Sequence, residues 1–274
     1  MPARFSRSGA GAGGAIMKHV LRWGAILILA LVAGPPAFTQ QSSPHASIIQ
    51  KMLAVDQLYE QKEYQDAIRG YQALLAEDPH NAHVLNRLGI VYETLQNMQE
   101  AKHYYQSALD ADPHYSIAVN NLGSLAYNSK HYGRAARQYR KAIKMDPTVA
   151  SYYSNLGYCY LHEKKYKDMV VAFRSALEID PTILDQHGRS GSVVIERGVE
   201  DHGTFYFYLA KTYGQMGDAD RCVDYLKKAR DEKYKDLANV RTDPAFARVR
   251  ANPVMKDFLD SLNPASVDRP TSAA

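Results

Sequence analysis

Cysteine is scarce in this sequence, and the residue patterns of common catalytic sites are absent. The 274 residues include two cysteines, Cys159 and Cys222, which is too few for a disulfide framework or a zinc-knuckle spacing. His162-Glu163 is not followed by a second histidine at metalloprotease spacing. Neither a Gly-x-Ser-x-Gly turn nor a Cys–His nucleophile pattern occurs. These absences argue against an enzyme, a metal site and a bound cofactor.

Acidic residues are missing from the first 39 residues, which contain four basic residues. Arg4, Arg7, Lys18 and Arg22 account for the whole formal charge of +4, because 29 basic and 29 acidic residues remain beyond them. Nucleic-acid binding depends on clustered positive charge that neutralises phosphates. A neutral body therefore predicts no nucleic-acid partner.

The same segment has the layout of a secretory signal peptide. Lys18 and Arg22 precede an apolar run over 23–33, which ends at Gly34. The run is shorter than the roughly 20 residues that span a bilayer. We predict an N-terminal extension and signal peptide over 1–39, with export to the bacterial periplasm or another extracytoplasmic space. If the segment is not cleaved, it would anchor the chain, and membrane contact would be limited to it.

One dipeptide recurs at a constant interval. Asp-Pro occurs four times, each time 34 residues after the last, at Asp78-Pro79, Asp112-Pro113, Asp146-Pro147 and Asp180-Pro181. With each proline at position 32, the repeats begin at Ile48, Ala82, Ser116 and Ala150. A repeat of this length leaves one apolar face open when alone, so successive repeats must stack.

Small and aromatic residues keep fixed positions within the repeat. Position 8 is glycine in three repeats, position 24 is always aromatic, and positions 20 and 27 are mostly alanine, as in Gly89, Ala101, Tyr105 and Ala108. Positions 4, 7, 8 and 11 share one face of a first helix, and positions 20, 24 and 27 share one face of a second. This pattern resembles the tetratricopeptide repeat without a gap over 48–181.

The resemblance implies an all-α fold, a right-handed α-solenoid of about five helix-turn-helix repeats with a helical C-terminal cap. The predicted order is a linker over 40–47, four contiguous repeats over 48–181, an insertion over 182–202, a fifth repeat over 203–236, a cap over 237–262 and a disordered tail over 263–274. The insertion is either a connector that tilts the fifth repeat away from the fourth or a lid that contacts a partner. Cys159 and Cys222 fall at helix-packing positions, which favours buried thiols over a disulfide.

The resemblance also implies a concave groove, lined by the first helix of each repeat, that binds a partner. The candidate residues are polar or aromatic: Asn86, Arg87, Asn120, Asn121, Ser124, Asn155, Tyr158, His162, Tyr208 and Lys211. Asparagine can pair with a peptide amide through both a donor and an acceptor. Tyrosine offers rigid contact area. The alternative for the asparagines is hydrogen bonding between the helices of successive repeats.

These features together predict an exported, non-catalytic scaffold that binds a peptide or protein partner and needs no cofactor. Two alternatives stay open. One is a structural subunit of an envelope or secretion assembly, which would associate through the edges of the solenoid. The other is an enzyme whose site is built by the insertion over 182–202.

Overall fold

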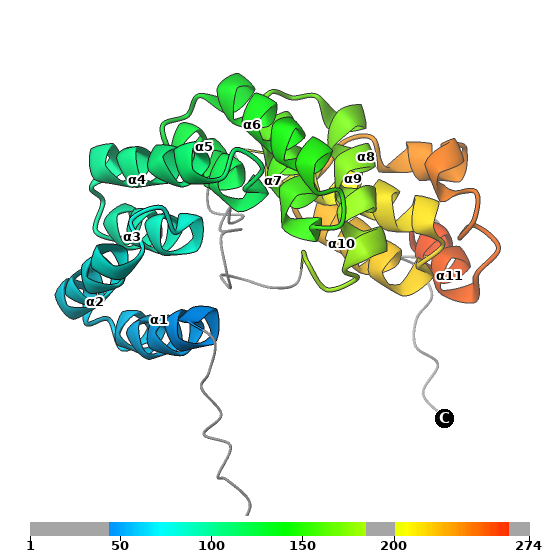
Figure 1. Ribbon diagram of the computed structural model, residues 1–274. Helices are drawn as coiled ribbons and strands as arrows, with labels where there is room; N and C mark the ends of the chain where they lie inside the picture. Colours follow the sequence, from blue (N-terminus) through cyan, green and yellow to red (C-terminus); the bar gives the residue numbers. More distant parts are fainter. Residues whose placement is uncertain (1–43, 185–200, 263–274) are drawn as a thin grey trace, which may run out of the picture. The chain divides into compact units, whose positions relative to one another are not determined.

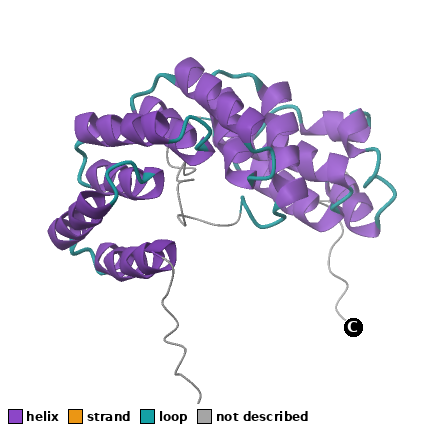
Figure 2. Cartoon of the chain, viewed as in Figure 1, coloured by secondary structure: helices purple, strands orange, loops and turns teal. Residues whose placement is uncertain are grey.

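The computed structural model of the protein describes residues 44–184 and 201–262, and both ranges are helical (Figures 1 and 2). Eleven α-helices and no strand occur in them, which confirms the predicted all-α fold. Across these ranges, every helix is too short or too polar to cross a bilayer. The predicted signal peptide, most of the insertion and the predicted tail lie outside the described residues.

Ten of these α-helices form five successive hairpins, one for each repeat. The first four hairpins pair α1 (Pro44–Glu60) with α2 (Tyr64–Glu77), α3 (Ala82–Thr94) with α4 (Met98–Ala111), α5 (Ser116–Asn128) with α6 (Tyr132–Met145), and α7 (Ala150–His162) with α8 (Tyr166–Ile179). The fifth pairs α9 (His202–Met216) with α10 (Ala219–Asp231). The 3-10 helices η2 (Leu237–Arg241) and η3 (Pro244–Phe246) and the helix α11 (Pro253–Ser261) follow.

The helices α3, α5 and α7, which open the second, third and fourth repeats, begin where the 34-residue period places them, at Ala82, Ser116 and Ala150. The helix α1 instead begins at Pro44, four residues before the predicted start. The last four residues of the predicted linker over 40–47 form the first turn of α1. Proline is favourable there because its missing N–H would have no partner in the first turn of a helix.

Glycine at position 8 allows the two helices of a hairpin to approach. A Cβ added at this position would meet the position-24 ring, at 2.4 Å for Gly89 and Tyr105, 2.7 Å for Gly123 and Tyr139, and 2.5 Å for Gly157 and Phe173. The first repeat exchanges the two sizes, because Val55 stands at position 8 and a Cβ added at Gly70 would lie 2.7 Å from its Cγ2. Each of the four hairpins thus packs one glycine against a large side chain.

The fifth hairpin is reversed relative to the fourth. In the regular stack, Tyr132 at the start of α6 stacks on His162 at the end of α7, with ring centroids 4.3 Å apart, so these two helices are antiparallel. Tyr166 at the start of α8 instead stacks on Tyr208 in the first half of α9, with centroids 4.6 Å apart. Further along both helices, Arg174 Nη1 donates to Gln215 Oε1 at 3.4 Å. The helices α8 and α9 are therefore parallel.

The long connection between α8 and α9 is what permits this reversal. The helix α8 has 14 residues and is about 21 Å long, a distance that the short connections between the earlier hairpins do not cover. Arg221 near the start of α10 donates to the Pro181 carbonyl at 2.9 Å, just beyond the end of α8. The sequence predicted a tilt of the fifth repeat as one possibility, whereas the structure shows a change of direction.

The residues after α10 complete the core of the fifth hairpin. Val240, Phe246 and Met255 are fully buried, in one apolar cluster with Tyr213 of α9 and Leu226 of α10. Two side chains cap the short helices that bring these residues in. Asp243 Oδ1 accepts from the Ala245 N–H at 2.9 Å, and Asn252 Oδ1 accepts from the Val254 N–H at 2.9 Å. The segment covers the apolar face that a further repeat would otherwise cover.

Candidate partner-binding face

Side chains of the first helices of the four regular repeats form a polar and aromatic surface, which we call the first-helix face. Its members are partly or fully exposed: Asp56 of α1, Arg87 and Glu93 of α3, Ser124 and Asn128 of α5, and Tyr158 and His162 of α7. All of them project from helices whose other side packs into the hairpins. The fifth repeat does not continue this face in register, because α9 is reversed.

Four of the predicted asparagines lie beneath this face and bind one another. Asn86, Asn120, Asn121 and Asn155 are each at most 7% exposed. Asn155 Nδ2 donates to Asn120 Oδ1 at 3.0 Å, Asn120 Nδ2 donates to Asn121 Oδ1 at 3.2 Å, and Asn121 Nδ2 donates to Asn86 Oδ1 at 2.9 Å. This chain joins α7, α5 and α3, as the interhelical alternative requires. Contact between these asparagines and a partner stays a prediction.

The position-24 tyrosines reach the first-helix face with their hydroxyl groups. Tyr105 donates to Glu93 Oε2 at 2.7 Å, and Tyr71 donates to Asp56. Burial is the main cause that raises the pKa of both phenols, and the neighbouring carboxylates raise it further. Both tyrosines therefore stay protonated and donate to the carboxylates. In the third repeat the partner is neutral, because the Tyr139 hydroxyl lies 3.3 Å from the Ser124 hydroxyl.

The two carboxylates differ in their second partner. Arg87, a predicted site residue, lies with Nη2 3.2 Å from Asp56 Oδ2, which joins the first and second repeats by an ion pair. Glu93 instead accepts from Asn128 Nδ2 of the third repeat at 3.1 Å. Burial raises the pKa of the Glu93 carboxyl, and the hydrogen bond from Tyr105 only partly opposes this. The partly buried carboxylate of Glu93 is therefore bound by two neutral donors, Tyr105 and Asn128.

Sequence reasoning missed Asp56 and Glu93. They stand at positions 9 and 12 of their repeats, and the candidate residues, apart from Ser124, were amides, aromatic residues and bases. A usable signal was present in the sequence: both repeats have an acidic residue on the first helix and a tyrosine at position 24. The tyrosine ring packs on position 8 of the first helix, and this contact brings its hydroxyl group close to the acidic residue.

An aromatic group lies between the third and fourth repeats. His162 stacks on Tyr132 and makes an edge contact with Tyr127, at a centroid distance of 5.5 Å. Tyr158 contacts Phe173 edge-on at 5.1 Å. Phe173 has no hydroxyl group, and Tyr158 stands at position 9 of the fourth repeat, where the first and third repeats have the polar residues Asp56 and Ser124. Aromatic and imidazole rings with exposed edges are well suited to bind extended peptides.

The two site residues predicted on α9 make contacts within the chain. Tyr208 stacks on Tyr166 of α8. Lys211 Nζ lies 2.8 Å from Asp243 Oδ2, and both side chains are about 20% exposed, at 21% and 20%. Lys211 also lies over the Tyr208 ring, with 5.2 Å between Nζ and the centroid. These contacts tie α9 to the fourth repeat and to the cap, and a role for either residue in partner binding remains a prediction.

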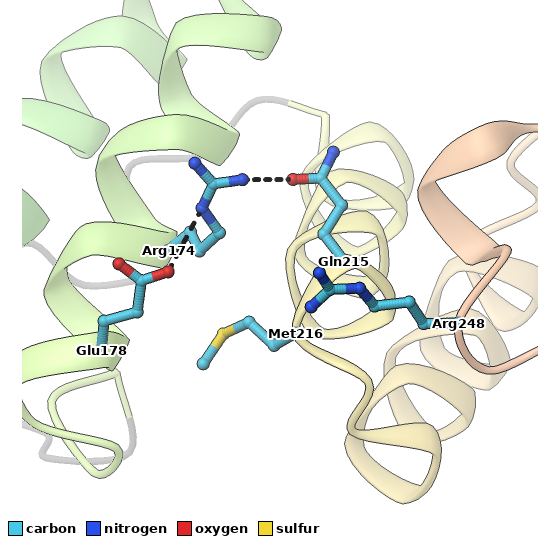
Figure 3. A pocket seen from close by; sticks show the side chains of 5 residues that line it. All are labelled: Arg174, Glu178, Gln215, Met216 and Arg248. Atoms are coloured by element: carbon cyan, nitrogen blue, oxygen red, sulfur yellow. Dashed lines mark hydrogen bonds and ion pairs between the residues drawn. The ribbon is translucent and has the colours of Figure 1, made fainter.

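A cavity of about 380 Å³ lies where the reversed helix α9 meets α8. Figure 3 shows Arg174 and Glu178 of α8 on one side, Gln215 and Met216 of α9 on the other, and Arg248 reaching in from the cap. Arg174 Nε lies 3.5 Å from Glu178 Oε1, and its Nη1 binds Gln215. The polar groups of the cavity therefore bridge the fourth and fifth repeats, at a place where regular stacking is interrupted.

The two cysteines are buried free thiols. Burial is the main cause that raises the pKa of each thiol to about 12, for both Cys159 and Cys222. The thiolate, which is the nucleophile and the metal ligand, is therefore scarce at neutral pH. Within the described ranges, no three His, Cys, Asp or Glu side chains are grouped closely enough to hold a metal ion.

Comparison with protein families gives a match to the tetratricopeptide repeat over residues 52–116 and 120–182, and a second tetratricopeptide model matches residues 204–230. Together these matches cover more than half of the chain. They include the reversed fifth hairpin, so its helix pair keeps the repeat pattern although its direction changes. A search of curated proteins finds no match.

Several solved structures are similar to this chain. Pseudomonas aeruginosa pilF is 16% identical, with a TM-score of 0.50, over 79% of this chain and 89% of that one. MamA is 22% identical, with a TM-score of 0.45, over 67% of this chain and 96% of that one. YrrB, a tetratricopeptide protein with an unusual peptide-binding site, is 19% identical, with a TM-score of 0.44, over 70% of this chain and 89% of that one. At these identities the likeness concerns the fold alone.

Proposed function

Because the chain belongs to the tetratricopeptide repeat family, we propose that it is a non-catalytic scaffold that binds an extended segment of a protein partner on its first-helix face. One observation carries the proposal. Rigidly held polar and aromatic groups are partly or fully exposed on the first helices, while the asparagines beneath them join α3, α5 and α7. A preorganised surface of this kind lowers the entropy cost of binding a peptide.

The test uses the full chain and a random peptide library displayed on phage. Peptides selected on the parent chain are measured against the double substitution Tyr158→Ala with His162→Ala, which removes two half-buried rings of the first-helix face. We expect at least a tenfold loss of affinity, since aromatic side chains often supply the main binding energy of an interface. Thermal unfolding of both proteins shows whether the fold is retained.

The matched control is Arg140→Ala with Lys141→Ala, two exposed positions on the second helix α6. This pair leaves the first-helix face intact, so the selected peptides should bind it as they bind the parent chain. Equal binding to all three proteins would move the site elsewhere. Failure to select any peptide that binds the parent would overturn the proposed function.

Export to an extracytoplasmic compartment is part of the proposal and is supported by the sequence of residues 1–39. A fusion of residues 1–45 to a reporter enzyme that is active only outside the cytoplasm tests it. We expect activity with the natural segment and loss of activity when Leu27, Leu29 and Leu31 are changed to Glu, because charges in the apolar run prevent recognition as a signal. Activity that survives this change would contradict export by this segment.

A further inference from the structure

Two carboxylates of the first-helix face share one kind of hydrogen-bond donor. Asp56 and Glu93 both accept the hydroxyl of the position-24 tyrosine of their own repeat. For Asp56, the next repeat supplies the guanidinium of Arg87, with Nη2 3.2 Å from Oδ2. This carboxylate is therefore neutralised within the chain.

Glu93 lacks such a counter-ion. The next repeat supplies the neutral amide of Asn128, and no lysine, arginine or histidine of the described ranges pairs with Glu93. The residue that corresponds to Arg87 in the next repeat is Asn121, whose amide is already bound to Asn86. A partly desolvated carboxylate is costly unless an opposite charge accompanies it, and here the chain offers only neutral donors.

Glu93 is partly exposed on the first-helix face. Two donors occupy two of its roughly four acceptor positions, so others are left for a further donor. Asn128 and Thr94 beside it are exposed, and the Tyr59 hydroxyl lies 3.0 Å from the Thr94 hydroxyl. A bound segment that crosses from α3 to α5 would pass this group of polar side chains.

We infer that Glu93 binds a positively charged group of the partner, a lysine or arginine side chain or a free N-terminal ammonium. The inference rests on the proposed function and adds the chemistry of the partner segment. The cation would neutralise the Glu93 carboxylate, as Arg87 neutralises the Asp56 carboxylate. The pKa of the Glu93 carboxyl, raised by burial, is consistent with a group that lacks a counter-ion in the unbound chain.

The experiment compares the parent with Glu93→Gln in the phage selection described above. We expect peptides from the parent to share a lysine, an arginine or a free N-terminus at one register, and peptides from the variant to lack it. The conservative replacement retains an oxygen for Tyr105, and Asn128 can turn its amide to face the new group. Asp110→Asn at an exposed position of α4 is the control and should keep the basic preference.

A double-mutant cycle then isolates the pair. One selected peptide is made in a basic and a neutral version, with the lysine or arginine replaced by glutamine or the N-terminus acetylated, and both versions are titrated against both proteins. We expect the basic version to bind the parent at least tenfold more tightly than the neutral one, and the two versions to bind the variant equally. Separate arms for lysine, arginine and the N-terminus identify the source of the charge.

The possible failures can be told apart. If no peptide binds the parent, the proposed function is overturned and this inference falls with it. If peptides bind but carry no basic group, or if the basic preference survives in Glu93→Gln, this inference alone is overturned. Thermal unfolding adds a second reading: a binding role predicts an unchanged or higher Tm for the variant, whereas a lower Tm with unchanged basic preference would make Glu93 a structural residue.

Discussion

The four regular repeats and the fifth repeat with its cap achieve stability in different ways. The regular repeats use similar contacts many times: a glycine packs against a large side chain within each hairpin, and an asparagine chain joins the second, third and fourth hairpins. The fifth repeat uses contacts that occur once, such as the Lys211–Asp243 ion pair and the bridge from Arg174 to Gln215. Successive repeats can use the same contacts as long as their helices keep the same direction. A hairpin with reversed helices needs different contacts.

The largest loss of stability is expected when a side chain is added at the glycine that packs against the position-24 ring. Gly89→Ala places a Cβ 2.4 Å from the Tyr105 ring, and the hairpin must open to accept it. We expect a loss of about 3 kcal/mol in the free energy of unfolding, measured by urea denaturation. Gly133→Ala is the control, because its Cβ meets only the flexible Glu163 side chain at 3.2 Å. Equal stability of the two variants would show that the hairpins are not closely packed at position 8.

The second effect concerns the buried amides between repeats. Asn120→Ala removes the residue that both donates to Asn121 and accepts from Asn155, and it leaves buried polar groups without partners. We expect a loss of about 2 kcal/mol in the free energy of unfolding. Asn239→Ala at an exposed position of η2 should change it little. A neutral result for Asn120→Ala would mean that the amide chain does not hold the first helices together.

The third effect tests the ion pair of the fifth repeat. Burial raises the pKa of the Asp243 carboxyl, but the hydrogen bonds from Lys211 and Ala245 and the charges of Lys211 and Arg250 lower it more, so it lies below its ordinary value. Its stabilisation is therefore present above the ordinary pKa of about 3.9 and is lost as the pH falls through the lower folded value.

Asp243→Asn should therefore cost about 1.5 kcal/mol at pH 7, and less as the solution is acidified. Urea denaturation at a series of pH values measures the difference from the parent. Asp231→Asn is the control, because that carboxylate is 72% exposed and should contribute little. A cost for Asp243→Asn that stays constant down to pH 3 would show that the carboxylate charge does not fasten the cap to α9.

The smallest effect compares the turns inside the hairpins. Position 15 is left-handed in each repeat, with φ of 65° at Lys62, 61° at Gln96, 60° at Lys130 and 57° at Lys164, and 88° at Gly217 in the fifth. We expect Lys130→Gly to stabilise the protein by about 0.5 kcal/mol and Gly217→Ala to destabilise it by about 1 kcal/mol, since only glycine adopts this conformation without strain. Thermal unfolding measures both, and a change of the same sign in the two variants would contradict this explanation.

Much of the fold could be predicted from the sequence because its signals are local. The starts of α3, α5 and α7 follow from the proline period, and the hairpin contact follows from glycine at position 8 with an aromatic residue at position 24. The site was harder to predict. Asn121 and Asn155 have the composition of a binding surface, yet their burial depends on how closely α3, α5 and α7 approach. Asp56 and Glu93 were missed because their importance comes from hydroxyl groups that are 12 to 15 residues away in the sequence.

The sequence alone determined the repeat, its period and its helical hairpins, because each of these depends on side chains a few residues apart or on copies of the same pattern. The direction of the fifth hairpin was decided only in the tertiary structure. The pattern of α9 is compatible with packing either way, and in the structure α9 lies parallel to α8 and packs against the cap. The counter-ions of Asp56 and Glu93 were decided there as well, since the neighbouring repeat supplies an arginine to the first and an amide to the second.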